Sequence, residues 1–106
     1  MGLQISASGD VSYKVEDDEY RLDSSDLTEG EWVLNAPAQY KEDDEEWNVT
    51  LSAHTDHGTF TWLLNVTIGV NGSDVQDAWR TDPEGVSEVE DCMSFELQHI
   101  PDAATW

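Results

Sequence analysis

Residues 47–70 read WNVTLSAHTDHGTFTWLLNVTIGV, and this stretch decides the fold. Apolar and polar residues alternate through both of its halves, which is the period-two pattern of half-buried β-strands. The halves meet at Thr55-Asp56-His57-Gly58, where glycine suits a tight turn because it adopts positive φ without strain. The stretch therefore predicts a long antiparallel hairpin. Its inward faces are expected to carry Trp47, Val49, Leu51, Ala53, Phe60, Trp62, Leu64, Val66, Ile68 and Val70.

Shorter segments on both sides of this hairpin also alternate. The ranges expected as strands are 3–7, 11–15, 20–22, 32–36 and 93–97. The first two are expected to pair as an N-terminal hairpin that turns at Ser8-Gly9-Asp10. Ser73 is placed to cap a short helical turn that reaches Trp79 and ends before Pro83. The predicted fold is all-β, or a β-rich α+β fold, built as an antiparallel β-sandwich of six to seven strands with one short helical turn.

The length of 106 residues suits one domain. We expect a single β-rich domain over 1–100 and a frayed C-terminal tail over 101–106. The lone Cys92 has no cysteine to pair with inside the chain, so a reducing compartment is expected. The sequence shows no secretory signal and no apolar stretch of membrane-spanning length, which favours a cytoplasmic protein without a membrane partner.

The charge is the outlier of the composition. Asp and Glu total 24 against 4 Lys and Arg, which gives a formal net charge of -20. A chain without a basic patch has nothing to displace the counterions of a phosphate backbone, so direct nucleic-acid binding is excluded. Five Trp and three Tyr supply enough apolar surface to expect an ordered domain rather than a disordered acidic chain.

Part of this charge lies in two similar phrases, YKVEDDEYRL at 13–22 and YKEDDEEWNV at 40–49. Each is expected to end one strand, cross an acidic connection and begin the next strand, and the two connections are expected to lie beside one another. Like charges at this density repel at ordinary salt, where the screening length is about 8 Å. The acidic residues of the two runs are Glu16, Asp17, Asp18, Glu19, Glu42, Asp43, Asp44, Glu45 and Glu46.

A basic protein partner best explains why the chain carries carboxylates that repel one another. Clustered carboxylates steer such a partner and can occupy a groove that evolved for phosphates. Immunity proteins of basic toxins and proteins that mimic DNA to block restriction or CRISPR machinery share this size and charge, which is a likeness of class only. The two acidic runs, together with Trp79 as an aromatic anchor, are therefore the predicted binding residues for a nuclease, a toxin or a nucleic-acid-binding complex.

Two alternatives stay open. In a protein of a high-salt cytoplasm the same acidity is a solubility device, and the function is then not readable from charge. A weak calcium- or sugar-binding β-sandwich is the other alternative, although neither acidic run has the spacing of a calcium loop.

No motif indicates catalysis. The chain lacks a nucleophile elbow, a P-loop and a dinucleotide-binding glycine pattern, so we expect no enzyme, no catalytic residue and no cofactor. His54, Asp56 and His57 sit in the central turn, but no further histidine or cysteine is placed to complete a zinc site. We interpret them as an exposed turn, and whether they bind a metal stays open, as does the oligomeric state.

Overall fold

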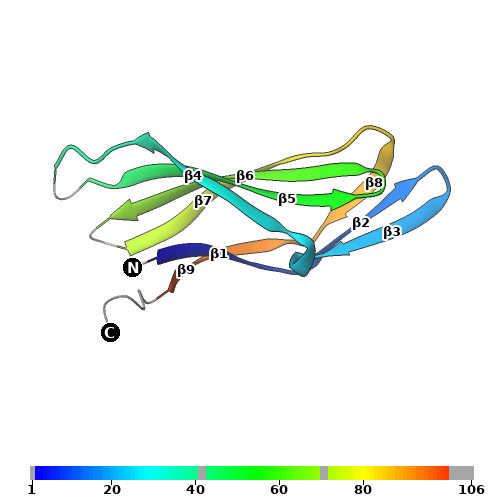
Figure 1. Cartoon of the computed structure of the whole chain (residues 1–106), viewed down its shortest axis with the longest axis horizontal. Helices are drawn as coiled ribbons and strands as arrows, with labels where there is room; N and C mark the ends of the chain where they lie inside the picture. Colours follow the sequence, from blue (N-terminus) through cyan, green and yellow to red (C-terminus); the bar gives the residue numbers. More distant parts are fainter. Residues whose placement is uncertain (1, 41–42, 70–71, 101–106) are drawn as a thin grey trace.

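The computed structural model describes residues 2–40, 43–69 and 72–100, which form antiparallel β-sheets (Figure 1). The expected tail at 101–106 and the inward Val70 lie outside the described residues. None of the described helices is long and apolar enough to cross a membrane. The elements are β1 (Gly2–Ser8), β2 (Asp10–Val15), β3 (Asp18–Asp23), the 3-10 turn η1 (Ser24–Asp26), β4 (Thr28–Ala36), β5 (Glu45–Thr55), β6 (Gly58–Gly69), β7 (Gly72–Thr81), β8 (Val86–Asp91) and β9 (Ser94–Ile100).

The central hairpin is confirmed as β5 and β6. Thr55 pairs with Gly58, so Asp56 and His57 form the two-residue turn, and Gly58 has the positive φ of 123° that favours glycine. Inward partners face each other across the pair, as Leu51 does with Trp62. The alternation therefore identified both the strands and the face that they bury.

The strands form three sheets, ordered β1-β9, β3-β2-β8 and β4-β5-β6-β7. The β-rich antiparallel prediction is confirmed, whereas the predicted two-sheet sandwich of six to seven strands is not what the described residues show. Two of the sheets are successive parts of one long ribbon. Ser8 lies opposite Ser94 and Val11 lies opposite Asp91, so the pairing keeps its register across the bend between them.

The predicted N-terminal hairpin is wrong. β1 pairs with β9, and β2 pairs with β3 and β8, so the chain bends at Gly9 instead of reversing there. Gly9 has a φ of 94°, and a Cβ added to it would lie 2.1 Å from the carbonyl oxygen of Cys92. The glycine is needed because the backbone between β8 and β9 passes too close for any side chain.

The predicted helical turn after Ser73 is also wrong, because these residues form β7. The register between β6 and β7 shifts at Gln76: Val75 pairs with Val66, and Ala78 pairs with Leu64. This β-bulge places inward residues three positions apart, which imitates the spacing of a helix. The 3-10 turn of the structure lies instead at Ser24–Asp26, between the expected strands at 20–22 and 32–36.

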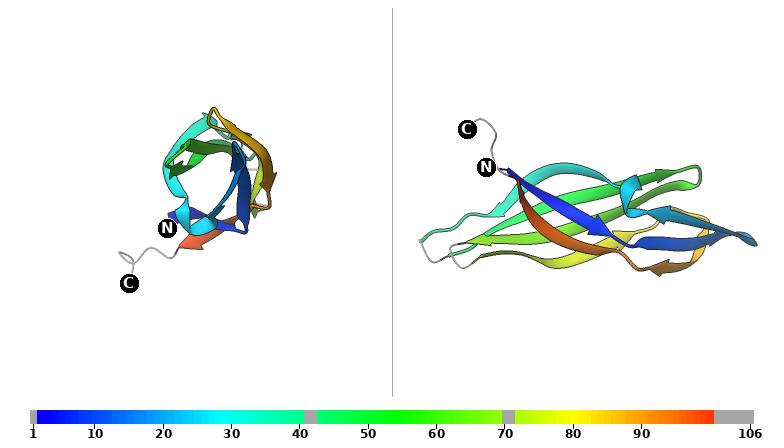
Figure 2. Two further views of the ribbon diagram at one scale, coloured as in Figure 1. Left: turned by 90° about the vertical axis from the view of Figure 1, so that its right-hand side faces the viewer. Right: turned by 90° about the horizontal axis from the view of Figure 1, so that it is seen from below.

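The three sheets surround one core, as the view along the molecule shows (Figure 2). The molecule is elongated, with extents of 53 × 31 × 19 Å. Burying a side chain such as Phe60 or Trp62 contributes about 1.5–3 kcal/mol or more, so the central hairpin supplies much of the apolar stabilisation. The buried residues are Val11, Tyr13, Leu22, Val49, Leu51, Ala53, Phe60, Trp62, Leu64 and Val66.

Candidate functional site

Three tips of the fold gather at one end of the molecule, which we call the hairpin end (Figure 1). They are the β2–β3 turn at Glu16 and Asp17, the β5–β6 turn at Asp56 and His57, and the β7–β8 connection at 82–85. Antiparallel neighbours reverse direction at each connection, so turns separated by two strands return to the same end of a sheet. The order of the strands thus brings three separate segments together.

Aromatic and close backbone contacts hold these tips in place. The His57 ring lies 4.3 Å from that of Tyr20, and its Nδ1 lies 3.5 Å from Tyr13 Oη. On the other side of the turn, a Cβ added to Gly58 would meet Pro83 at 2.4 Å. The β5–β6 turn is therefore packed between the other two tips, and the hairpin end is a fixed surface.

The first acidic run lies at the tip of β2 and β3. Val15 pairs with Asp18, which leaves Glu16 and Asp17 as the two-residue turn. Glu16 has a φ of 58°, a conformation normally given to glycine or asparagine and one that costs other residues about 1–2 kcal/mol. All four carboxylates of the run, including Glu19, are exposed to solvent.

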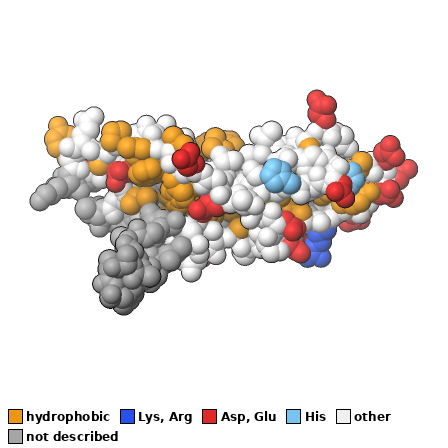
Figure 3. Space-filling model, in the orientation of Figure 1, with side chains coloured by type: hydrophobic (Ala, Val, Ile, Leu, Met, Phe, Trp, Pro, Cys, Tyr) orange, Lys and Arg blue, Asp and Glu red, His pale blue; other side chains and the backbone are white. Residues whose placement is uncertain are grey.

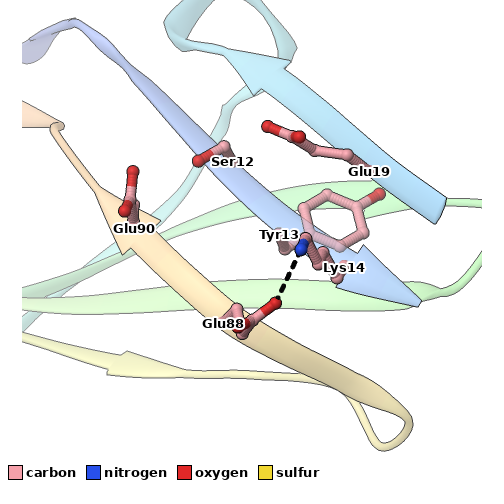
Figure 4. Close-up of a pocket in the computed structure, with 6 residues that line it drawn as sticks. All are labelled: Ser12, Tyr13, Lys14, Glu19, Glu88 and Glu90. Atoms are coloured by element: carbon pink, nitrogen blue, oxygen red, sulfur yellow. Dashed lines mark ion pairs between the residues drawn. The ribbon is translucent and has the colours of Figure 1, made fainter. Parts of the chain in front are cut away.

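A hollow of about 240 Å³ opens beside this run and is lined by residues of three strands (Figure 4). Lys14 lies in it, 3.0 Å from a carboxylate oxygen of Glu88. The hydrogen bond that Lys14 donates to Glu88 raises the pKa of Lys14 above its ordinary value, and the negative charge of Glu88 adds to the effect. Glu19 and Glu90 complete a wall on which three carboxylates outnumber one ammonium group.

The second acidic run lies at the opposite end, which we call the loop end (Figures 1 and 2). Asp43 is engaged in the loop itself, because its Oδ2 accepts hydrogen bonds from the backbone N–H groups of Gln39 and Tyr40. Asp44 lies against Gly69, whose added Cβ would be 1.8 Å from the carboxylate. Glu45 and Glu46 begin β5 and are half-buried, while Glu42 lies outside the described residues.

The expectation that the two runs lie beside one another is therefore wrong. They mark the two ends of an elongated molecule, because β2–β3 and β4–β5 connect at opposite ends of the sheets (Figure 1). Figure 3 shows Asp and Glu side chains at the hairpin end and also, more sparsely, on the other half of that face, where hydrophobic side chains gather. A compact binding site for a partner can therefore include one of the two acidic runs but not both.

Trp79 belongs to neither end. It lies two residues before the end of β7, is 54% exposed, and pairs with Leu63, which is 41% exposed and lies in the middle of β6. Both point to the outer side of the four-stranded sheet, since Trp62 and Leu64 on either side of Leu63 are buried in the core. We call this side the outer face, on which Val33, Asn48, Thr50, Thr61, Leu63 and Trp79 lie. Asp77 lies on the same face, opposite Asn65.

Sequence reasoning missed four carboxylates of the hairpin end. Asp56 was treated only as a turn residue, and the other three lie in β8 and the connection before it, where no strand was predicted. The order of the turns was the available signal, because successive turns between antiparallel strands lie at alternate ends of the sheet. The missed residues are Asp56, Glu84, Glu88 and Glu90.

The central turn holds its two histidines in different contacts. His54 Nδ1 lies 2.9 Å from Thr59 Oγ1, whereas His57 packs on Tyr20. Among the residues that the structure describes, no three His, Cys, Asp or Glu side chains are grouped as ligands for a metal ion. The chemistry that the hairpin end offers is accordingly that of hydrogen-bond acceptors and negative charge.

The hairpin end thus combines a rigid frame with a dense set of carboxylates, and it is the candidate site. Its carboxylates and aromatic contacts come from segments that are distant in the chain, so no short sequence motif describes the site. Comparisons with protein-family models, with curated proteins and with solved structures found no match for this chain.

Proposed function

We propose that this protein is a non-enzymatic acidic inhibitor of the immunity or DNA-mimic type. Its hairpin end presents carboxylates to a basic, nucleic-acid-processing protein at the place where phosphates would bind. The first acidic run forms the protruding part of this surface, and the wall with Glu88 and Glu90 extends it along β8. A negative surface of this kind steers a positive partner toward it and raises the association rate.

The observation that carries the proposal is the arrangement of exposed carboxylates from three tips around a fixed frame. Packing of His57 against the stacked rings of Tyr13 and Tyr20 holds the surface in shape before a partner arrives. A preformed surface loses little conformational entropy on binding, which favours affinity. Lys14 lies among these carboxylates but is already paired with Glu88, so it leaves the net negative field in place.

A matched pair of variants tests which end binds. The hairpin-end variant changes Glu16→Gln, Asp17→Asn, Asp18→Asn and Glu19→Gln. The loop-end variant changes Asp43→Asn, Asp44→Asn, Glu45→Gln and Glu46→Gln. Each removes four negative charges, so the two have the same net charge and lose it at opposite ends. Thermal melts check that both are folded, because Asp43 also accepts two backbone hydrogen bonds.

The measurement is inhibition of a panel of DNA-cleaving enzymes, with duplex DNA as the substrate. We expect the protein to inhibit at least one enzyme in competition with DNA. The hairpin-end variant should weaken that inhibition about tenfold or more, because charges at the contact steer association, while the loop-end variant should change it little. Equal weakening by both variants, or no inhibition across the panel, would contradict the proposal.

Adaptation to a high-salt cytoplasm is the second candidate, and a specific observation favours it. Exposed carboxylates also occur along strands away from the hairpin end, such as Glu31 in β4, Asp74 in β7 and Glu96 in β9. Charge spread in this way suits a solubility device. The salt dependence of folding separates the two candidates, since an adapted protein needs salt to fold and an inhibitor does not.

A further inference from the structure

A second hollow, of about 300 Å³, opens at the hairpin end and is lined by residues of two sheets. One side belongs to β2, β3 and η1, and the other belongs to the end of β5 and the β5–β6 turn. Sites for small ligands span about 300–1,000 Å³, so this volume suits a single long side chain. We call it the Tyr20 hollow, and its lining includes Tyr13, Tyr20, Leu22, Asp26, Asp56 and His57.

The walls of the Tyr20 hollow are aromatic and apolar. The ring centroids of Tyr20 and His57 are 4.3 Å apart, and Tyr20 stacks on Tyr13 at 5.7 Å. Tyr13 and Leu22 are 4% and 3% exposed, so they lie at the floor, whereas Tyr20 and His57 are half-buried and keep part of their rings accessible. An aromatic ring presents a negative electrostatic face, which attracts a cation.

Two carboxylates come from opposite sides of this hollow. Asp56 is exposed in the β5–β6 turn and forms no ion pair within the described part of the chain. Asp26 is exposed in η1, and its Oδ2 accepts a hydrogen bond of 2.9 Å from the backbone N–H of Asp23, which occupies one of its two oxygens. An aromatic wall between two carboxylates favours a ligand that is both flat and positively charged.

The cationic residue that also lines the hollow is directed away from it. Arg21 lies between Tyr20 and Leu22, whose side chains point inward, so its own side chain points to the opposite face of β3. On that face its guanidinium pairs with Asp10. Arg21 therefore does not neutralise the carboxylates of the hollow.

We propose that the Tyr20 hollow receives an arginine side chain of the basic partner. The guanidinium stacks on the accessible rings and donates hydrogen bonds to Asp26 and Asp56. Arginine fits better than lysine because its planar group both stacks on aromatic rings and pairs with carboxylates in two-pronged contacts. Arginine is also over-represented where proteins recognise phosphates, so a groove for nucleic acid offers this side chain. The inference rests on the proposed function and names the group that the partner inserts.

An amide NMR titration of the full chain in 0.15 M salt tests the hollow. The probe is N-acetyl-arginine amide, and the matched neutral probe is N-acetyl-citrulline amide, in which a urea group replaces the guanidinium. We expect the arginine probe to bind with a dissociation constant on the order of 10 mM. The shift changes should centre on Tyr20, Asp56 and His57 and spare Glu88 and Glu90, and the citrulline probe should bind at least about fivefold more weakly.

Two pairs of variants separate the hollow from the general negative charge. Asp56→Asn removes a carboxylate of the hollow, and Asp17→Asn removes one from the other exposed turn of the hairpin end. Tyr20→Leu removes the aromatic face, and Tyr40→Leu removes an exposed ring at the loop end. We expect Asp56→Asn and Tyr20→Leu to weaken binding of the arginine probe about threefold or more, and the controls to change it less than about 1.5-fold, because salt screens distant charges. Dispersed amide spectra check that every variant is folded.

Several results would overturn the inference. They are absence of binding, shift changes centred on the hollow that contains Lys14, equal losses in Asp56→Asn and Asp17→Asn, and equal binding of the two probes. Tighter binding of methyl glucoside than of the arginine probe would overturn it too, because the rings would then be a sugar platform. Inhibition of an enzyme in the panel without binding of the arginine probe refutes only the role of the hollow. Binding of the probe without inhibition of any enzyme refutes only the proposed function.

Discussion

The indole Nε1 of Trp62 donates a hydrogen bond of 3.1 Å to Oδ2 of Asp91. Trp62 is 1% exposed in the middle of β6, whereas Asp91 ends β8, so this bond joins two of the three sheets. The same carboxylate accepts from Arg80 at 3.0 Å and from the backbone N–H of Met93 at 2.9 Å. One side chain thus fixes where the ribbon lies on the four-stranded sheet.

Replacing Asp91 with Asn should destabilise the protein by about 1–3 kcal/mol, because a buried indole and a guanidinium lose a charged acceptor. The measurement is the free energy of unfolding in urea. Glu90→Gln is the matched control, since Glu90 is exposed and next to Asp91 in the chain. That control should change stability by less than about 0.5 kcal/mol, and equal costs for both variants would refute the role given to Asp91.

The two tryptophans of the central hairpin should respond differently to the same change. Trp62→Phe loses the bond to Asp91, whereas the Nε1 atom of Trp47 is buried and has no hydrogen-bond partner among the described residues. Trp47→Phe therefore removes an unpaired polar group, which offsets part of the lost packing. Urea unfolding should show Trp62→Phe to be the more costly by about 1–3 kcal/mol. A larger cost for Trp47→Phe would contradict this assignment.

Two glycines with similar φ values separate backbone strain from close contact. Gly9 and Gly85 have φ values of 94° and 88°, but only Gly9 lies against another segment, at Cys92 between β8 and β9. Gly85→Ala should cost about 1–2 kcal/mol through strain alone. Gly9→Ala should cost about 1–3 kcal/mol more, because the added methyl group overlaps the Cys92 carbonyl. Equal thermal shifts for the two variants would show that the bend is not tightly packed.

The pair of Lys14 and Glu88 has a defined pH dependence. Because the folded-state pKa of Lys14 is raised above 10.5, its contribution to stability is fully present below that pH. The contribution is lost as pH rises through the higher folded value. An NMR titration of the lysine side chain should give a pKa above 10.5 in the wild type and a lower value in Glu88→Gln. An unchanged pKa in that variant would mean that Glu88 is not the cause.

The sequence was informative wherever a strand keeps strict alternation. The central hairpin could be predicted because inward and outward residues exchange at every step from Trp47 to Thr55. In β7 and β8, β-bulges interrupt the alternation, so these strands could not be predicted from it. A register shift at Gln76 sets Val75 and Ala78 three positions apart. In β8 the shift accompanies a positive φ of 49° at Glu88, so the pattern of alternation is again lost.

The candidate site was predictable only in part, and for a topological reason. Local sequence identified the acidic runs, including Glu16 and Asp17 at the turn, because charge and turn chemistry are properties of neighbouring residues. Which run meets Asp56 or Glu84 depends on the order of strands in the sheets, which local patterns do not encode. The contact of Leu63 with Trp79 could not be predicted for the same reason, since the two become neighbours only when β6 and β7 pair.

The most direct test of the central claim, that the acidic hairpin end serves recognition, is the thermal unfolding curve in dilute buffer and in molar potassium chloride. We predict a cooperative transition from a folded state in dilute buffer, because the core and the contact of Trp62 with Asp91 hold the fold without added salt. A chain that is unfolded in dilute buffer and folds only in molar salt would contradict the account, and its acidity would then be an adaptation to salt.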